Sequence, residues 1–457
     1  MIKQRIEAPK QEANKRIQNF DEVCLGYTKE QAIEEASRCL QCPKPFCVNG
    51  CPVNVNIPKF IKALKEGNSD KALNIIQKTN NLPGVCGRVC PQEEQCESKC
   101  ILKGRGQALN IGKLERYASD HGKKEVPIIE KKDDKKIAIV GSGPSGLTCA
   151  ADLALMGYKV TLFEALHKCG GVLSYGIPEF RLPKKIVEDE VEFIKSLGVE
   201  IKTNQVIGRT IEVGELLEKY DAVFIGSGAG TPYFMSIPGE SLNNVYSSNE
   251  FLTRINLMKA YRFPEYVTPI KKGNKTVVIG GGNVAMDSAR WAKRLGSNVT
   301  VVYRRSEEEM PAREEEIANA KEEGIQFVLL TNPTQIVGND KVEGIECIQM
   351  MLSDADKDGR RKPVPIENSE FIIECDQVIV AIGQKPNPLL LKGSKLQHEE
   401  EGYLIVNEHL QTSDKRVFAG GDITHGDTVI KAMGDGKKAA RGILEWFKQR
   451  KIVDFEN

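Results

Sequence analysis

The sequence of 457 residues lacks three features that would each define a class of protein. It has no run of about 18 apolar residues, the length that a membrane-spanning helix needs. It has no excess of one charge, because 64 Lys and Arg balance 63 Asp and Glu to a net charge of +1. This balance argues against a protein that coats nucleic acid or an anionic membrane. The start, Met1–Arg5, has no apolar signal core. We therefore expect a soluble, cytoplasmic protein, with about three domains at this length.

Cysteine is sparse along most of the chain and concentrated near its start. Thirteen residues are Cys, and eight of them lie between positions 39 and 100. In an intracellular protein such a concentration more often binds metal than forms disulfides. The others stand alone, and we expect them to be small buried hydrophobic residues: Cys24, Cys149, Cys169, Cys347 and Cys375.

The eight concentrated cysteines form two runs, Cys39-x2-Cys42-x4-Cys47-x3-Cys51-Pro52 and Cys86-x3-Cys90-Pro91-x4-Cys96-x3-Cys100. Bacterial ferredoxins use a similar run ending in Cys-Pro, in which the last Cys binds the other cluster. The pattern predicts two [4Fe–4S] clusters. One is held by Cys39, Cys42, Cys47 and Cys100, and the other by Cys51, Cys90 and Cys96 with a fourth ligand, for which spacing alone nominates Cys86. The alternative is structural zinc, which usually takes paired Cys-x2–4-Cys hooks.

Helical spacing marks two segments before residue 130. Thr28–Ala36 begins with a capping box of Thr28 and Gln31, and Ile57–Leu64 has Pro58 near its start. The charged run 122–136 is expected to be a solvated surface linker whose charges need no partner. Residues 354–359 resemble the start of a calcium loop, but Pro365 stands where that loop requires Glu, so we expect a surface turn.

A first dinucleotide fingerprint follows the linker. The apolar strand Ile137–Val140 leads into a glycine-rich turn and a helix, with the expected contacts at Gly141, Gly143, Ser145 and Gly146. Such a turn lets backbone N–H groups approach a pyrophosphate at the helix N-terminus. The next strand, Lys159–Phe163, ends at Glu164, whose carboxylate can accept hydrogen bonds from both ribose hydroxyls. The unit predicts a dinucleotide with an unmodified ribose, FAD or NAD.

A second fingerprint begins at Thr276–Ile279. Its turn is of the Gly-x-Gly-x-x-Ala type, with the expected contacts at Gly280, Gly282, Asn283 and Ala285. The following strand ends in Arg304 and Arg305, where an acid would otherwise stand. Two guanidinium groups suit a 2′-phosphate, which a carboxylate would repel. The alternative is that these arginines form only surface ion pairs. We assign NADP(H) to this site and FAD to the first.

The order of the motifs predicts an α/β fold with two dinucleotide-binding (Rossmann-like) domains and an N-terminal all-α iron–sulfur domain. The expected parts are iron–sulfur 1–130, FAD-binding 131–235, an inserted NADP(H)-binding domain 236–383 and the returning FAD-binding part 384–457. In the returning part, we expect Gly421 and Asp422 on the ribityl–phosphate arm of the flavin. Thr428 and Val429 begin a helix whose positive end can stabilise negative charge at the reduced flavin.

Several motifs together resemble one family. They are Cys86–Pro91, Gly170–Pro183, Gly280–Asn283, Tyr303–Arg305, Met310–Glu316 and Ala419–Asp422. Over nearly the whole chain, the combination is similar to the small (β) subunit of NADPH-dependent glutamate synthase and its relatives. The segment Asn249–Tyr261 most resembles the large subunit of NADH-dependent reduced ferredoxin:NADP+ oxidoreductase.

The resemblance implies further site residues. In this family and in the related dihydropyrimidine dehydrogenase, one cluster takes a non-Cys ligand from an Ile-Gly-x-Leu-(Glu/Gln) stretch, here Ile111–Glu115. Glu115 would then complete the second cluster and Cys86 would be a bystander. A carboxylate ligand should shift the potential of that cluster. Gly171, in the run Gly170–Pro183, is placed at the FAD by the same resemblance.

These features imply an electron-transfer enzyme. NADPH and FAD exchange a hydride and two clusters relay single electrons, so the cofactors carry the chemistry and no acid–base residue is expected. The expected partner is a second redox subunit. It is either a ferredoxin/NAD-linked flavoprotein subunit, as in electron bifurcation, or the glutamate synthase large subunit, which forms glutamate from glutamine and 2-oxoglutarate. Ferredoxin is a further candidate, and no binding of nucleic acid or membrane is expected.

Three other interpretations fit the sequence less well. A disulfide reductase needs a Cys pair facing the flavin, and none follows Gly170–Gly171. A complete glutamate synthase needs an amidotransferase and an FMN barrel, for which the assigned residues leave no room. A non-enzymatic scaffold would not need intact glycines, Glu164, paired arginines and cluster ligands together.

Overall fold

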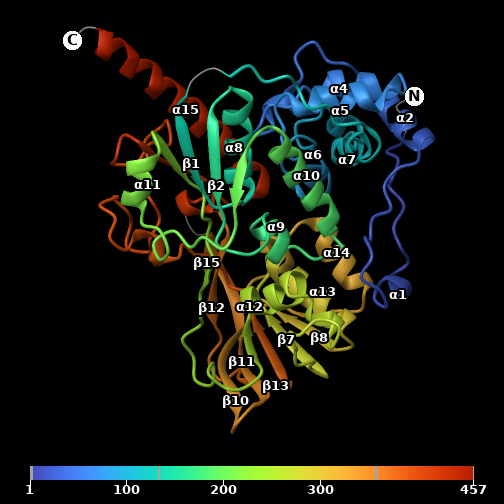
Figure 1. Cartoon of the computed structure of the whole chain (residues 1–457). Helices are drawn as coiled ribbons and strands as arrows, with labels where there is room; N and C mark the ends of the chain where they lie inside the picture. Colours follow the sequence, from blue (N-terminus) through green and yellow to red (C-terminus); the bar gives the residue numbers. More distant parts are fainter. Residues whose placement is uncertain (1–3, 132–133, 356–358, 456–457) are drawn as a thin grey trace.

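The computed structural model describes residues 4–131, 134–355 and 359–455. Figure 1 shows a helical part at the start of the chain and two parts that are each built on a parallel β-sheet. The two sheet-containing parts lie one above the other, and the helical part packs beside the upper one. Among the helices of the described residues, none is long and apolar enough to cross a membrane.

The helical part contains both helices that the spacing predicts. The Thr28 hydroxyl accepts a hydrogen bond from the Gln31 N–H, and the Gln31 side chain accepts one from the Thr28 N–H, which confirms the capping box. The helices are α1 (Ala13–Arg16), α2 (Lys29–Ser37), α3 (Phe46–Asn49), α4 (Ile57–Lys65), α5 (Ser69–Gln77), α6 (Pro83–Val89) and α7 (Ile111–His121), with the 3₁₀ turn η1 (Ile101–Arg105).

The upper sheet has the parallel order β16-β4-β1-β2-β3. Its strands are β1 (Lys136–Val140), β2 (Lys159–Phe163), β3 (Glu200–Lys202), β4 (Ala222–Ile225) and β16 (Val417–Ala419). The helices of this part are α8 (Pro144–Leu155), α9 (Val172–Tyr175), α10 (Lys184–Ser196), α11 (Val213–Lys219) and α15 (Val429–Phe455), with 3₁₀ turns η5 (Pro388–Leu391) and η6 (Asp422–Thr424). Helix α15 lies close on α8, because a Cβ on Gly436 would come within 2.3 Å of the Ser145 carbonyl oxygen.

The lower sheet repeats this plan with the parallel order β6-β14-β7-β8-β9. Its strands are β6 (Val245–Ser247), β7 (Lys275–Ile279), β8 (Asn298–Val302), β9 (Gln326–Val328) and β14 (Gln377–Val380). The helices are α12 (Ser248–Leu252), α13 (Asn283–Arg294) and α14 (Glu314–Glu322), with short turns η2 (Thr253–Leu257), η3 (Ala260–Arg262) and η4 (Glu307–Glu309). Two parallel sheets with helices on their faces confirm the predicted α/β class.

An antiparallel sheet, which the sequence did not predict, is inserted between β9 and β14. Its strands are β10 (Thr331–Gly338), β11 (Val342–Ala355), β12 (Arg361–Pro365) and β13 (Phe371–Glu374). The turn predicted at 354–359 is wrong at its start, since residues 354 and 355 belong to β11, and residues 356–358 lie outside the described residues.

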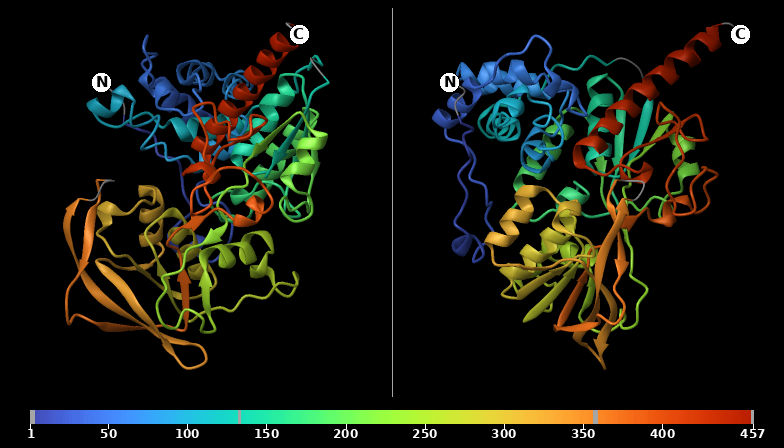
Figure 2. Two further views of the ribbon diagram at one scale, coloured as in Figure 1. Left: turned by 90° about the vertical axis from the view of Figure 1, so that its left-hand side faces the viewer. Right: turned by 180° about the vertical axis from the view of Figure 1, so that it is seen from behind.

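The chain passes twice between the two parallel sheets, and the passages run side by side. β5 (Thr231–Pro232) leads down and pairs antiparallel with β15 (Gln384–Lys385), which leads back. Figure 2 also shows the start of the chain running along the outside to reach the lower part. There Arg16 donates from Nε to Glu323 at 2.8 Å, close to α14. All three parts are thus linked.

Two expectations need correction. The linker is not purely solvated, because Lys124 Nζ donates to the buried Glu190 at 2.6 Å. Among the solitary cysteines, Cys149, Cys347 and Cys375 are buried, but Cys24 and Cys169 are only partly buried. None of the thirteen cysteines, all within the described residues, forms a disulfide.

Candidate cofactor and cluster sites

The first glycine-rich turn joins β1 to α8. Gly141 has a φ of +95°, and a Cβ here would lie 2.5 Å from the Gly226 carbonyl oxygen at the end of β4. A Cβ on Gly146 would lie 1.9 Å from the Gly141 carbonyl oxygen. Only glycine fits both positions, as expected for the tight turn and the close helix–strand packing of a dinucleotide site.

A cavity of about 350 Å³ opens beside this turn at the carboxyl ends of β1, β2 and β4. Six of the residues predicted for FAD line it: Gly141, Gly143, Ser145, Glu164, Gly171 and Asp422. Of the described residues, the lining does not include four others that were predicted: Gly146, Gly421, Thr428 and Val429. Gly146 serves packing, and the Thr428 hydroxyl accepts a hydrogen bond from the Lys431 N–H at 3.4 Å, at the start of α15.

Glu164 is buried at the end of β2 and faces the turn. Its carboxylate accepts hydrogen bonds from the Ser142 N–H at 3.0 Å and the Leu166 N–H at 2.8 Å, and also from the Ser142 hydroxyl. These contacts hold the acid at the rim of the cavity, in the position that recognises a ribose in such folds.

Asp422 lies across the cavity, on the segment between β16 and α15. Burial, together with the nearby Asp427 and Asp435, raises the pKa of Asp422 to about 6. The Asp435 carboxylate accepts a hydrogen bond from the Gly421 N–H at 2.9 Å. Gly421 therefore shapes the end of β16, while Asp422 faces the cavity.

The second glycine-rich turn joins β7 to α13 and has the same construction. Gly280 has a φ of +134°, and a Cβ here would lie 2.2 Å from the Ala381 carbonyl oxygen, just beyond β14. Ala285 is fully buried beneath the turn, where a small side chain lets the helix approach the strand. A cavity of about 650 Å³ lies over the turn and is lined by Gly280, Gly282 and Asn283.

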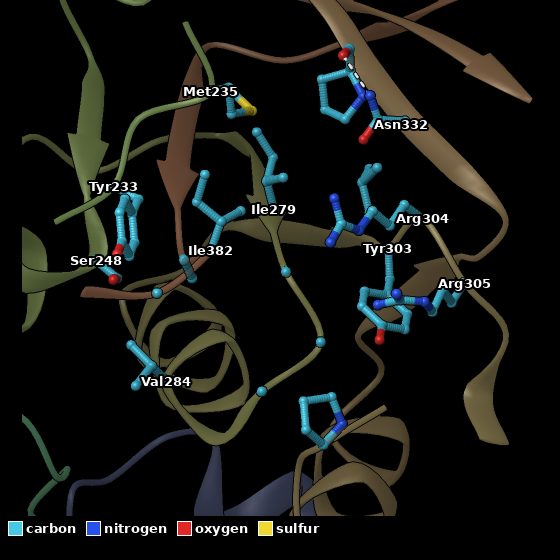
Figure 3. Close-up of a pocket in the computed structure, with 18 of the residues that line it drawn as sticks. Tyr233, Met235, Ser248, Ile279, Val284, Tyr303, Arg304, Arg305, Asn332 and Ile382 are labelled. Atoms are coloured by element: carbon cyan, nitrogen blue, oxygen red, sulfur yellow. Dashed lines mark hydrogen bonds between the residues drawn. The ribbon is translucent and has the colours of Figure 1, made fainter. Parts of the chain in front are cut away.

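Both predicted arginines line this second cavity. Figure 3 shows Arg304 and Arg305 on one side of it, across from Tyr233 and Ile382. Arg304 is exposed, whereas Arg305 is buried and donates from Nε to the Arg361 carbonyl oxygen at 2.8 Å. Arg305 thus also holds the start of β12, and Arg304 is the freer of the two groups to meet a ligand.

The structure adds cavity residues that sequence reasoning missed. The run Gly226–Gly230 after β4 lines the first cavity, and its three glycines directly after an apolar strand were a usable signal. Arg360 lines the second cavity from the antiparallel sheet. No local motif marks it, because only the fold brings that sheet to the nucleotide turn.

The first group of thiols is Cys39, Cys42, Cys47 and Cys100. Burial, together with the nearby Cys100, Cys39 and Cys42 thiols, raises the pKa of Cys47 to about 12. All four are only partly buried, so the group lies near the surface. The four residues that the ferredoxin-like spacing assigned to one cluster are therefore close together.

The second group combines Cys51, Cys90 and Cys96 with two further side chains, Cys86 and Glu115. Charges on Cys51, Cys90 and Glu115 all act on the Cys96 thiol, whose pKa is raised above all by burial. Within the described chain, no three His, Cys, Asp or Glu side chains converge closely enough to hold a single metal ion. A cubane of four irons spreads its ligands more widely than one ion does, and thiolates are the ligands that such clusters take.

Glu115 and Cys86 both border this second group. Burial raises the pKa of Glu115 to about 7, although Asn80 Nδ2 donates to its carboxylate at 2.7 Å. The Cys86 sulfur lies 3.4 Å from the Met433 sulfur and 3.7 Å from Asn80 Oδ1. Cys86 thus packs against α15 and also lies beside the Cys90 thiol, and the Asn80 side chain contacts both Cys86 and Glu115.

Among known proteins, two family models match two separate parts of this chain. A family model described as pyridine nucleotide-disulphide oxidoreductase matches residues 123–436. A second, described as dihydropyrimidine dehydrogenase domain II, 4Fe-4S cluster, matches residues 16–126. Among solved structures, FprA from Mycobacterium tuberculosis in complex with NADPH shares the fold, with a TM-score of 0.60 and 22% identity over 70% of this chain and 86% of that one.

Three curated relatives are similar over most of this chain. The glutamate synthase [NADPH] small chains of Halomonas elongata and Escherichia coli are each 37% identical over 97% of this chain, and over 96% and 98% of their own lengths. The NADPH-Fe(3+) oxidoreductase subunit beta of Geobacter sulfurreducens is 37% identical over 89% of this chain and 64% of its own length.

The fold, the two cavities and the matches to known families together define the class of this protein. It is an NADPH-dependent oxidoreductase with FAD- and NADP(H)-binding domains and a 4Fe-4S cluster domain. Within this class, the chain belongs to the family of glutamate synthase small chains and their relatives.

Proposed function

We propose that this protein is the electron-transfer subunit of a larger cytoplasmic redox enzyme. When bound, FAD exchanges a hydride with NADPH, and two [4Fe–4S] clusters pass single electrons to or from a partner subunit. The proposal is carried by the presence of two similar nucleotide cavities whose bordering side chains differ in charge. The first cavity is bordered by Glu164 and the second by Arg304 and Arg305, and the strands β5 and β15 connect the two parts that contain them.

Each of the two cavities has residues that can make the contacts its dinucleotide needs. A Cβ on Gly143 or Gly282 would meet no atom closer than 3.9 Å, so each of these glycines leaves room beside its cavity for a pyrophosphate to meet backbone N–H groups. Glu164 would hold the ribose of FAD, and Arg304 the 2′-phosphate of NADPH. The task of the chain is to align the two dinucleotides, since alignment is what hydride exchange demands of the protein.

The thiol groups supply a path away from the flavin domain. We assign one cluster to Cys39, Cys42, Cys47 and Cys100, and the other to Cys51, Cys90, Cys96 and Glu115. The second group adjoins α15 through the Cys86–Met433 contact, so it lies next to the FAD-binding part. The first group is nearer the surface. Electrons would therefore leave through the first group.

The surface around the first thiol group suits a partner. Leu40, Phe46 and Ile101 are 47%, 61% and 47% exposed, and each is next to one of the group's cysteines. Five basic side chains nearby have no ion-pair partner within the described residues: Lys44, Lys59, Lys99, Lys103 and Arg105. Apolar residues with a basic rim favour an acidic redox partner, because opposite charge speeds encounter.

Two partners are candidates for this surface. A glutamate synthase large subunit is favoured by full-length relatives that are named small chains. A ferredoxin/NAD-linked flavoprotein subunit, with electron bifurcation, is favoured by the segment Asn249–Tyr261, two residues of which, Asn249 and Thr253, line the FAD cavity. Anaerobic purification from the native organism distinguishes them. A glutamine amidotransferase subunit would indicate the synthase, and a smaller flavoprotein with a [2Fe–2S] centre would indicate bifurcation.

Anaerobic mixing with reduced nucleotide tests the redox function itself. NADPH should bleach the flavin absorbance and NADH should do so only at much higher concentration. Equal bleaching by both nucleotides, or by neither, would contradict the proposal.

A further inference from the structure

The edge of the NADP(H) cavity is formed in part by the segment Met310–Arg313. Pro311 lines the cavity. The Ala312 N–H donates to the Gly281 carbonyl oxygen at 3.2 Å, and the Arg313 N–H donates to Asn283 Oδ1 at 3.1 Å. The backbone before and at Arg313 is therefore fixed directly to the glycine-rich turn that would carry the nucleotide pyrophosphate.

The guanidinium group of Arg313 extends from the NADP(H)-binding part and contacts the helical part. It donates to the Arg88 carbonyl oxygen at 3.3 Å, to Gln92 Oε1 at 3.1 Å and to Glu93 Oε1 at 3.0 Å. These three acceptors surround Cys90 in the sequence. The Arg313 charge also lies within electrostatic range of the Cys90 thiol.

The loop that Arg313 contacts, around Cys90, is tightly packed. Gln92 Nε2 donates to the Cys86 carbonyl oxygen at 3.1 Å, and a Cβ on Gly112, at the start of α7, would lie 2.4 Å from the same nitrogen. A closely packed interior transmits a displacement to its neighbours. A shift of Arg313 would thus reach the backbone on both sides of Cys90.

Other links between these parts lack direct contact with the nucleotide turn, including the hydrogen bond that Lys113 Nζ on α7 donates to Glu315 at 3.2 Å. Lys10 Nζ donates to Asn319 Oδ1 at 3.2 Å, and Arg16 donates to Glu323. Both join the start of the chain to α14 and end away from the cysteine runs. Arg313 instead has one end on the nucleotide turn and the other on the cysteine loop.

We propose that Arg313 is a positioning residue that couples occupancy of the NADP(H) cavity to the iron–sulfur cluster at Cys90. The inference rests on the proposed function, since it needs both the nucleotide and the cluster. Coupling of this kind is reciprocal: if the nucleotide changes the potential of the cluster, reduction of the cluster changes the affinity for the nucleotide by the same free energy.

The test uses 2′-phospho-ADP-ribose, which has the 2′-phosphate and pyrophosphate but no nicotinamide and so takes no hydride. Its Kd is measured for the anaerobic holoenzyme, oxidised and dithionite-reduced, and the cluster signal is followed by EPR with and without it. We compare the natural protein with Arg313→Gln, with Arg313→Lys, which keeps the charge but not the three hydrogen bonds, and with Arg16→Lys, which weakens a link to Glu323 that does not reach the cysteine loop.

We expect Kd to differ about fivefold between the two redox states of the natural protein, which is about 40 mV for one electron at 59 mV per tenfold. The EPR line shape should change when the ligand binds. In both Arg313 variants the Kd difference that the cluster causes should be lost while the iron content is kept, and Arg16→Lys should behave as the natural protein.

Equal differences in the natural protein and in the Arg313 variants, with unchanged EPR responses, would overturn the role of Arg313 and leave the proposed function intact. A natural protein without a cluster signal would overturn both.

Discussion

The two cofactor cavities differ most in the residues that follow their second strands. Glu164, which is held by two backbone N–H groups, directly follows β2, and Arg304 and Arg305 follow β8 after Tyr303. A carboxylate suits the free hydroxyls of a ribose, and a guanidinium suits a 2′-phosphate. The choice of nucleotide at each site is thus made by one or two side chains on otherwise similar scaffolds.

Removing the two guanidinium groups should therefore change the choice of nucleotide. For Arg304→Ala with Arg305→Ala, we expect the KM for NADPH to rise about tenfold or more, since a hydrogen bond to a charged group contributes about 1.5–3 kcal/mol. The KM for NADH should change much less. Steady-state kinetics with both nucleotides checks this. Lys321→Ala is the control, because Lys321 pairs with Glu307 and is not part of the cavity lining. Equal rises for both nucleotides would remove the 2′-phosphate assignment.

Single substitutions can also identify the eighth cluster ligand. Glu115→Ala should lose one cluster, so that iron falls from about eight to about four atoms per chain, while Cys86→Ala should keep both. The reason is the resemblance of Ile111–Glu115 to the stretch that supplies a non-Cys ligand in this family, because Cys86 and Glu115 both border the second thiol group. Iron and sulfide analysis of anaerobic protein checks this. The opposite pattern would make Cys86 the ligand.

At the level of elements, each site depends on one strand–turn–helix unit whose glycines cannot be replaced. Gly280→Ala would place a Cβ 2.2 Å from the Ala381 carbonyl oxygen, in a backbone conformation that costs an L-residue about 1–2 kcal/mol. We expect this variant to keep its flavin and lose most of its affinity for NADP+. Isothermal titration with NADP+ and flavin absorbance measure the two effects separately.

Gly296→Ala is the matched control for that experiment. Gly296 also has a positive φ, of +98°, but a Cβ there would meet nothing within 4 Å. It should cost some stability and leave the affinity for NADP+ unchanged. If both variants bind NADP+ normally, the turn at Gly280 does not form the nucleotide site.

How well the elements follow from the sequence depends on how local their signals are. The strands before both glycine-rich turns and the capped helix after Thr28 rest on short spacings, and the structure contains them all. The antiparallel sheet β10–β13 has no such spacing. Arg360, which this sheet brings to the NADP(H) cavity, was missed for that reason. Residue roles at the clusters stay predictions, because a thiol's position does not by itself identify what it binds.

For the molecule as a whole, the basic residues around the first thiol group predict that the rate of electron transfer to an acidic partner depends on salt concentration. Lys99→Glu with Lys103→Glu should slow electron transfer to an acidic plant-type ferredoxin about tenfold at low ionic strength, because it reverses charge at the rim of the first thiol group. The difference should shrink at high salt, where exposed charges are screened. Stopped-flow reduction of the ferredoxin measures both rates.

Lys195→Glu is the control for this rim, since Lys195 pairs with Glu192 on α10, outside the helical part. An equal slowing by the control variant would place the exit for electrons elsewhere.

The most direct test of the account is the cofactor content and redox response of the anaerobically purified protein. It should hold about eight irons, about eight sulfides and one FAD per chain, and NADPH should reduce both the flavin and at least one cluster, as seen by absorbance and EPR. Protein that holds zinc in place of iron, or whose flavin NADPH reduces without any electron reaching a cluster, would contradict an NADPH-linked relay through this chain.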